Sequence, residues 1–244
     1  MRGDAGFPVR VAFTKHGKVR FISHRDVARA FERAFRIEAL PLSFTQGFSP
    51  RPKVSFGLAL SVGHESEAEY LDVELATPIP LGPLPARLTG ALPEGIEVIA
   101  VEPLVDRAPA LQEAVGAVEW EIEVTGPGDS AAPAPLAVAR LVATAMAEAS
   151  LRITRTRKGR EAVEDIRPAL RRVEVLGGTE HGVRLGVEVT TQPVSVRPSE
   201  ILAGLGGELT ERRVLRTGQW IERGGARLEP LTADPRSAVE ARAS

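Results

Sequence analysis

Apolar and polar residues alternate at the start of the chain in a way that predicts strands beside one long helix. Alternation over residues 7–13 predicts a strand with one buried face, and the short apolar return over residues 19–22 predicts a second strand. Residues 24–36 then place apolar side chains at helical spacing, with arginines on the opposite side. We therefore expect an amphipathic helix there, with Ser23 as its N-cap.

The period-two pattern continues after this helix. It predicts strands over residues 42–45, 54–60 and 71–75, then a short helix over 84–92 and a strand over 96–102. Strands and helices in this order are typical of the split βαβ, or ferredoxin-like, arrangement.

The second half of the chain repeats this order of elements. Its expected elements are a strand over 118–124, a helix over 136–149, two hairpins over 151–168 and 171–190, a short helix capped by Ser199, and a strand over 212–221. The sequence thus predicts an α+β fold of two ferredoxin-like halves in tandem, with antiparallel sheets and helices on one face. The expected halves span 7–105 and 116–224, with a connection over 106–115 and a disordered tail over 225–244.

Charge is distributed unevenly although the formal net charge of the 244 residues is only −1. Residues 1–60 hold 11 Lys and Arg against 4 Asp and Glu, residues 61–150 hold 3 against 15, and residues 151–244 hold 17 against 13. A chain with basic ends can present a basic face to a polyanion. Alternatively, the segments neutralise one another across the fold.

Several kinds of site and location are disfavoured by composition. The chain has no cysteine, which excludes disulfides, thiolate metal sites and iron–sulfur ligation within it, and its four histidines lack metal-ligand spacing. The N-terminus has no long apolar run, so we expect neither a signal peptide nor a membrane span and place the protein in the cytoplasm.

Polar, basic and conformationally special residues concentrate at the start of the long helix and in the loop over residues 45–53. Because consecutive elements are neighbours in a split βαβ unit, we expect strand, helix N-terminus and loop to converge there. A helix N-terminus favours phosphate, cations add to that attraction, and an aromatic ring can stack on a base. The expected phosphate-binding residues are Arg20, Ser23, His24, Arg25, Gln46, Gly47, Phe48, Arg51 and Lys53. Alternatively, glycine and proline only shape a turn over the phenylalanine.

A second basic cluster falls on the expected tip of the first hairpin of the second half. Its members, Arg155, Arg157, Lys158 and Arg160, could reach a nucleic-acid backbone. The alternative is a charged turn that serves solubility alone.

His24 raises an enzymatic alternative. With Lys53 or Tyr70 nearby it could act as general acid or base in metal-independent RNA cleavage, although a histidine at a helix start can equally cap or pack. Glu65, Glu67 and Glu69 are expected to form a solvated strand edge. The sequence carries no P-loop, dinucleotide fingerprint or G-x-S-x-G motif.

The segments at residues 13–35, 40–75, 164–168 (EDIRP) and 196–202 (VRPSEIL) resemble the radical-SAM-associated family of unknown function. Its members occur alone or fused behind a cobalamin-binding radical SAM module. The resemblance implies a radical SAM partner that carries the iron–sulfur cluster and S-adenosylmethionine, with no cofactor in this chain. Histidine is common in that family where Arg51 stands here, which argues against acid–base chemistry at this position and leaves phosphate binding intact.

Together these observations predict a non-catalytic accessory module that binds tRNA or rRNA and presents it to the radical SAM partner. Two alternatives remain open. One is a metal-independent endoribonuclease that uses His24; the other is a protein-interaction adaptor that docks through the acidic strand bearing Glu119, Glu121 and Glu123.

Overall fold

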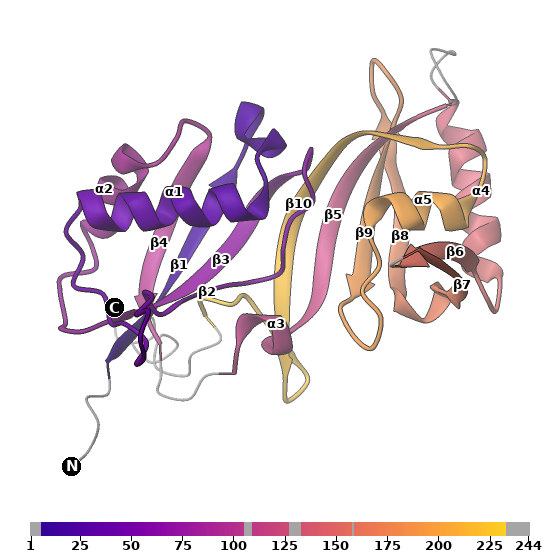
Figure 1. Cartoon of the computed structure of the whole chain (residues 1–244). Helices are drawn as coiled ribbons and strands as arrows, with labels where there is room; N and C mark the ends of the chain where they lie inside the picture. The colour runs from indigo at the N-terminus through magenta and orange to yellow at the C-terminus, as the bar shows by residue number, and fades with distance from the viewer. Residues whose placement is uncertain (1–5, 105–108, 127–132, 158, 233–244) are drawn as a thin grey trace. The chain divides into compact units, whose positions relative to one another are not determined.

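The computed structural model describes residues 6–104, 109–126, 133–157 and 159–232, and the chain divides into two compact units (Figure 1). Unit 1 comprises Met1–Val115 and Gln219–Ser244, and unit 2 comprises Gly116–Gly218. The chain therefore enters unit 2 once and returns to unit 1 within its last long strand, a return that hydrophobic pattern alone did not predict.

Unit 1 contains an antiparallel sheet in the order β4-β1-β3, with β2 on the far edge of β3. Its strands are β1 (Phe7–Lys15), β2 (Val54–Phe56), β3 (Glu65–Leu75) and β4 (Ile96–Pro103). The helices α1 (His24–Ile37) and α2 (Leu84–Ala91) follow β1 and β3 and pack into one core with the inward residues of the strands (Figure 1). One face of this sheet is thus covered by both helices.

Aromatic packing fixes α1 on the sheet. Phe31 is fully buried, and its ring centroid lies 4.7 Å from that of Phe13 on β1 and 6.0 Å from that of Phe56 on β2. At the start of the helix, the Ser23 hydroxyl accepts a hydrogen bond from the Asp26 amide. The predicted helix and its N-cap are therefore confirmed.

Unit 2 contains strands in the order β10-β5-β9-β8 and a separate hairpin of β6 and β7. The strands are β5 (Val115–Thr125), β6 (Arg152–Arg157), β7 (Arg160–Asp165), β8 (Leu170–Gly178), β9 (Val183–Thr190) and β10 (Thr210–Arg223). Its helices are α4 (Pro135–Ala147) and α5 (Pro198–Leu205), with a short 3₁₀ turn η2 (Arg167–Ala169). Helix α5 begins after Arg197, whose amide donates to Glu200, so the expectation that Ser199 is the cap is wrong.

The segment expected as a strand over residues 19–22 is instead a 3₁₀ helix, η1 (Gly17–Phe21). Two buried side chains satisfy its backbone in place of a sheet partner. The Lys15 ammonium lies 3.4 Å from the Arg20 carbonyl and 3.3 Å from the Ile22 carbonyl, and the Glu65 carboxylate accepts the Gly17 amide at 2.9 Å. Buried backbone amides and carbonyls need hydrogen-bond partners. The alternation of apolar and polar residues in the sequence does not indicate when side chains supply these partners in place of a neighbouring strand.

Two other predicted strands are shorter than expected. Residues 42–45 form only isolated bridges, from Leu42 to Leu75 and from Phe44 to Pro52. Strand β2 ends at Phe56, and a Cβ on the next residue, Gly57, would lie only 3.2 Å from the Tyr70 carbonyl oxygen. The Gly57 amide still donates to that oxygen at 2.9 Å.

Part of the predicted disordered tail is ordered, so that prediction is wrong for residues 226–228. These residues form β11 (Ala226–Leu228), which pairs with the end of β10. Gly224 and Gly225 both have positive φ, which allows the tight turn between the strands. The Pro230 carbonyl then accepts a hydrogen bond from the buried Arg10 at 2.9 Å. Residues 233–244 lie outside the described residues.

The predicted connection over 106–115 also contains structure. Residues 105–108 are not described, but Leu111–Ala114 form the short helix α3, and Leu111 is fully buried.

The first test concerns the aromatic core of unit 1. Phe31→Ala should lower the free energy of unfolding by about 3–5 kcal/mol, because it removes a fully buried ring and leaves a cavity. Phe48→Ala, at a fully exposed position, should change it by less than about 0.5 kcal/mol. Urea denaturation measures both, and equal values for the two variants would contradict this description of the core.

Candidate functional site

Strand β3 separates two of the residues that the sequence predicted to converge, Arg20 and Lys53. Arg20 pairs with Glu65 at one end of β3, at 3.5 Å, and Lys53 pairs with Glu74 near the other end, at 2.7 Å. Nine residues of extended strand span roughly 30 Å. Arg20 is therefore separated from Lys53 and its loop, and these two residues do not form one compact site.

The N-terminus of α1 is already occupied by a carboxylate. Asp26 accepts hydrogen bonds from the Ser23 hydroxyl at 2.7 Å and from Arg29 at 3.3 Å. The hydrogen bond from Ser23 is the main cause of a pKa for Asp26 below its ordinary value, so this group is ionised at neutral pH. A phosphate at the helix start would meet this negative charge, which removes Ser23 from the residues suited to bind it.

The groups proposed for acid–base chemistry do not come together. His24 is half-buried, and its ring lies edge-on to Phe56 at 5.2 Å. Lys53 is engaged by Glu74. Tyr70 alternates with the core residue Leu71 and so points to the opposite face of the sheet; burial is the main cause of its raised pKa. Neither proposed partner of His24 is beside it, which favours a packing role for this histidine.

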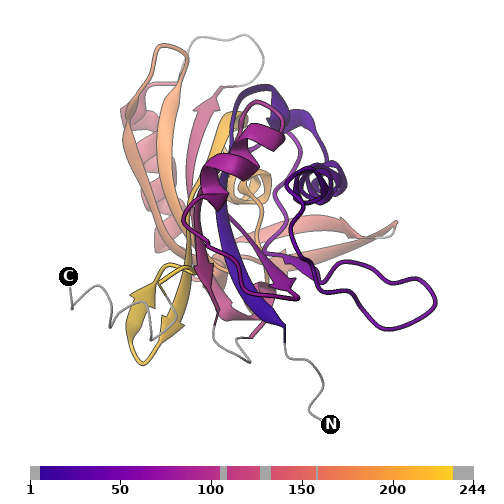
Figure 2. The ribbon, with the colours of Figure 1, turned by 90° about the vertical axis from the view of Figure 1, so that its left-hand side faces the viewer.

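Residues 43–53 form a loop closed by backbone pairing. The Lys53 amide donates to the Ser43 carbonyl, and Thr45 and Arg51 are joined twice, by Thr45 N–H to the Arg51 carbonyl at 2.9 Å and by Arg51 N–H to Thr45 Oγ1 at 3.0 Å. Glu74 of β3 bonds to both legs of the loop. Residues 46–50 form its exposed tip. In Figure 2 this loop projects from the strands on the side that carries α1.

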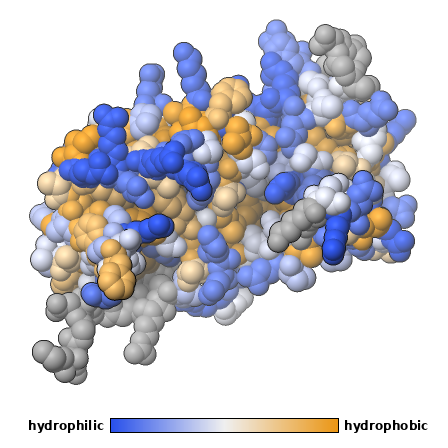
Figure 3. Space-filling view, in the orientation of Figure 1, coloured by the Kyte–Doolittle hydropathy of each residue, from blue (hydrophilic) through white to orange (hydrophobic). Residues whose placement is uncertain are grey.

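The outer side of α1 carries exposed arginines. Arg25, Arg33 and Arg36 are exposed and have no hydrogen-bond or ion-pair partner among the described residues, whereas Arg29 is paired with Asp26. Arg51 in the loop is likewise exposed, and only its backbone is bonded. Figure 3 shows hydrophilic side chains over α1, set in a largely apolar surround. We name Arg25, Arg33, Arg36 and Arg51 the basic face.

The second predicted cluster is divided by burial. Arg155 is 4% exposed, and its guanidinium donates to Glu164 at 2.6 Å, to Glu200 at 2.7 Å and to the Ser195 carbonyl at 2.9 Å. These bonds attach β6 to β7 and to α5, so Arg155 stabilises the hairpin and is not a surface contact. Arg160 is exposed, while Lys158 and the side chain of Arg157 lie outside the described residues.

The acidic strand β5 is neutralised by its neighbours. Glu119 pairs with Arg172 at 3.0 Å, Glu121 with Arg184 at 3.6 Å, and Glu123 with Arg212 at 2.7 Å. The sequence suggested an acidic docking surface, but cross-strand arginines from β8, β9 and β10 could not be assigned to these glutamates before the strand order was known.

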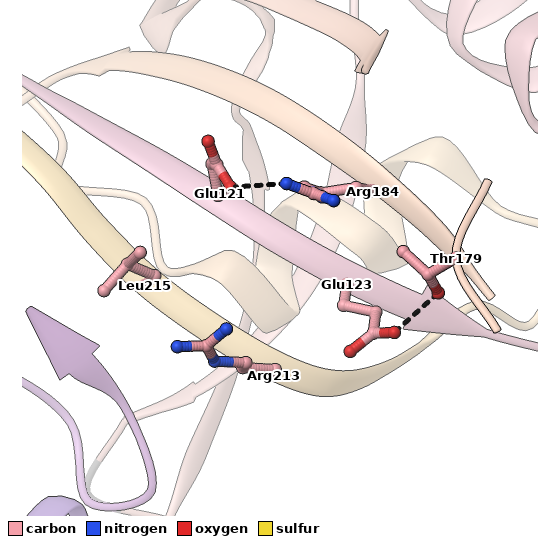
Figure 4. Close-up of a pocket in the computed structure, with 6 residues that line it drawn as sticks. All are labelled: Glu121, Glu123, Thr179, Arg184, Arg213 and Leu215. Carbon is pink, nitrogen blue, oxygen red and sulfur yellow. Dashed lines mark hydrogen bonds and ion pairs between the residues drawn. The ribbon is translucent and has the colours of Figure 1, made fainter. Parts of the chain in front are cut away.

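A pocket of about 210 Å³ lies over this part of unit 2 (Figure 4). Its lining residues are Glu121, Glu123, Thr179, Arg184, Arg213 and Leu215. Burial would raise the pKa of Glu123, but hydrogen bonds from Thr179 and Arg212 outweigh it and hold the pKa below its ordinary value. The carboxylates of this pocket are thus engaged by the protein itself.

The expected solvated edge at residues 65–69 is wrong for two of its three glutamates. Glu65 is 4% exposed and Glu69 is 6% exposed, while Glu67 is exposed. Glu65 anchors η1, and strand-like alternation in sequence did not reveal this use. Within the described ranges, no group of three side chains is arranged to hold a metal ion, and no helix has the length and apolarity that a membrane span requires.

Comparison with known proteins relates the chain to one family and to solved structures of similar fold. The family model described as "Uncharacterized protein conserved in bacteria (DUF2344)" matches residues 9–198. No curated protein matches.

Among solved structures, a Cbf5-Nop10-Gar1 complex is similar with a TM-score of 0.50 at 12% identity, covering 96% of this chain and 56% of that one. An archaeal box H/ACA sRNP Nop10-Cbf5 complex gives a TM-score of 0.47 at 13% identity, over 93% of this chain and 49% of that one. An H/ACA RNP bound to a substrate RNA containing 2'-deoxyuridine gives 0.45 at 14% identity, over 96% and 55%. The chain thus spans about half the length of the solved chains that it matches.

The role assigned to Arg155 is tested by stability. Arg155→Ala should lower the free energy of unfolding by about 3 kcal/mol, because it leaves a buried network without its cation; this is the low end of the usual range, since both carboxylates are partly exposed. Arg160→Ala on the same hairpin is the matched control and should change stability by less than about 0.5 kcal/mol. A wild-type unfolding midpoint for Arg155→Ala would show that the network is not structural.

Proposed function

This chain belongs to the bacterial family DUF2344, and from the chemistry of its surface we propose that it is an RNA-binding accessory module. The basic face of unit 1 holds the phosphate backbone of tRNA or rRNA. From the resemblance of the sequence to the radical-SAM-associated family, we further propose that the chain presents this RNA to a radical SAM enzyme, which would supply the iron–sulfur cluster and S-adenosylmethionine.

The observation that carries this proposal is that the guanidinium groups of the basic face have no hydrogen-bond or ion-pair partner among the described residues. Elsewhere in the described residues, many arginines form ion pairs with carboxylates of the same chain, as Arg155, Arg172 and Arg184 do. Arg25, Arg33 and Arg36 instead point away from the core, at helical spacing, on a helix whose opposite side is buried. Exposed guanidinium groups in a row match the repeated charge of a nucleic-acid backbone.

The fold is consistent with this role without specifying it. We propose that each unit is a ferredoxin-like half, because β4-β1-β3-β2 in unit 1 and β10-β5-β9-β8 in unit 2 give the same order relative to their helices, with the β6–β7 hairpin inserted in the second. The similarity to the Cbf5-Nop10-Gar1 complex, at 12% identity, concerns the fold. RNA binding by this chain is therefore argued from the basic face alone.

The two alternative functions have less support. An endoribonuclease centred on His24 lacks Lys53 and Tyr70 as neighbours, because the first is paired with Glu74 and the second points to the other face of the sheet. An adaptor that docks through Glu119, Glu121 and Glu123 would first have to break their pairs with arginines. Neither alternative has an arrangement of free groups comparable to the basic face.

Salt dependence tests the proposal directly. Fluorescence anisotropy with labelled tRNA gives the slope of log K against log salt concentration for the wild type and for Arg33→Ala. Each lost phosphate contact should reduce the magnitude of this slope by roughly 0.7–0.9, with weaker binding at low salt. The triple variant Arg25→Ala/Arg33→Ala/Arg36→Ala should show a larger reduction.

The matched control is Arg140→Ala, which removes an exposed arginine from α4 in unit 2. Its slope should equal that of the wild type. If the triple variant and the control both keep the wild-type slope, the basic face does not bind RNA.

A further inference from the structure

The tip of the loop over residues 43–53 presents an aromatic ring to solvent. Phe48 is fully exposed, at 111% of its reference area, and Phe44 at the base of the tip is 50% exposed. A phenylalanine at such a position contributes no core packing and leaves its whole apolar surface in water. Stability of the free protein does not account for this ring.

The loop holds this ring on a rigid base. Thr45 and Arg51 are joined by two hydrogen bonds, and the Ser43 amide and the Lys53 carbonyl are both bonded to the backbone of Glu74 on β3. Prolines at 50 and 52 fix φ on the returning leg. At the apex, Gly47 has φ of +136° with open space where a Cβ would be, so the turn is set by backbone conformation and not by packing.

The positive charge on the loop and on α1 indicates which kind of ligand the Phe48 ring would contact. Arg51 lies three residues from Phe48, and its guanidinium has no partner among the described residues. Arg33 and Arg36 lie on α1, on the same side of the strands as the loop (Figure 2). An exposed aromatic ring on the same loop as an arginine complements a base attached to a phosphate, since the base can stack on the ring while the phosphate pairs with the arginine.

The strandedness of the ligand follows from the geometry of stacking. In a duplex both faces of each internal base are covered by neighbouring bases, so a protruding ring finds no free face without unstacking them. An unpaired nucleotide offers its face directly. Gln46, also exposed at the tip, carries both donor and acceptor groups that suit the edge of such a base.

We infer that the ligand of the basic face is single-stranded RNA, with Phe48 stacked on an unpaired base and Arg51 beside its phosphate. This inference rests on the proposed RNA-binding function and names the class of RNA that the same face takes. The modified or presented nucleotide would then lie in a loop or an unpaired end of the substrate RNA.

The experiment compares a short labelled RNA with the same RNA annealed to its complement. Anisotropy titrations use the full chain as wild type, Phe48→Ala, Phe48→Leu and Phe48→Tyr. The wild type should bind the single strand more tightly than the duplex. Phe48→Ala and Phe48→Leu should weaken single-strand binding about fivefold or more, because stacking is lost, while Phe48→Tyr keeps it. Duplex binding should not change in any of the three.

The outcomes separate this inference from the proposed function. The stacking role would be overturned if Arg33→Ala weakened salt-dependent binding and Phe48→Ala did not. It would also be overturned if Phe48→Ala weakened binding to the single strand and to the duplex equally. In both cases the basic face would remain a phosphate site. Tighter binding of the duplex would overturn the assignment to single strands. Absence of binding to either RNA would overturn both proposals.

Discussion

The packing of α1 on the sheet of unit 1 is the interaction on which the proposed surface depends. Phe31 fills the space between Phe13 and Phe56, and this fixes which side of the helix faces the core. The opposite side must then face solvent, and it carries the arginines. The residue at the end of β2, Phe56, also contacts His24, so one aromatic cluster holds the helix start and packs the histidine that the sequence offered as a catalytic candidate.

Local patterns in the sequence predicted much of the fold because single elements report their own environment. The helix over residues 24–36 and the main strands follow from apolar spacing, and the helix cap follows from the serine that precedes it. The 3₁₀ turn at residues 17–21 does not, because one of the side chains that satisfy its backbone, Glu65, comes from β3, far away in sequence. The return of the chain to unit 1 within β10 has no local signal either. The turn before β11 is made by two glycines, but the same glycines are also compatible with the start of a disordered tail, so the hairpin was not predicted.

The candidate site was predictable as a set of residue types but not as a geometry. Arg25, Arg51 and Phe48 were predicted as site residues and are exposed, whereas Arg33 and Arg36 were predicted only as part of the polar side of the helix. Arg20 does not join them, because Glu65 and Glu74, the partners of Arg20 and Lys53, lie near opposite ends of β3. Ser23 does not join them either, because its hydroxyl is bonded to Asp26. The prediction that Arg155 is a surface contact was wrong for a different reason. A basic residue near a hairpin tip can be the buried cation of a network, and only the positions of Glu164 and Glu200 decide this.

Ultraviolet cross-linking of the full chain to tRNA, followed by mass spectrometry of the cross-linked peptides, tests the central claim most directly. Placing RNA on the basic face predicts cross-links within residues 24–37 and 43–53, with Phe48 among the modified positions. Cross-links confined to unit 2, with none in these two segments, would contradict it.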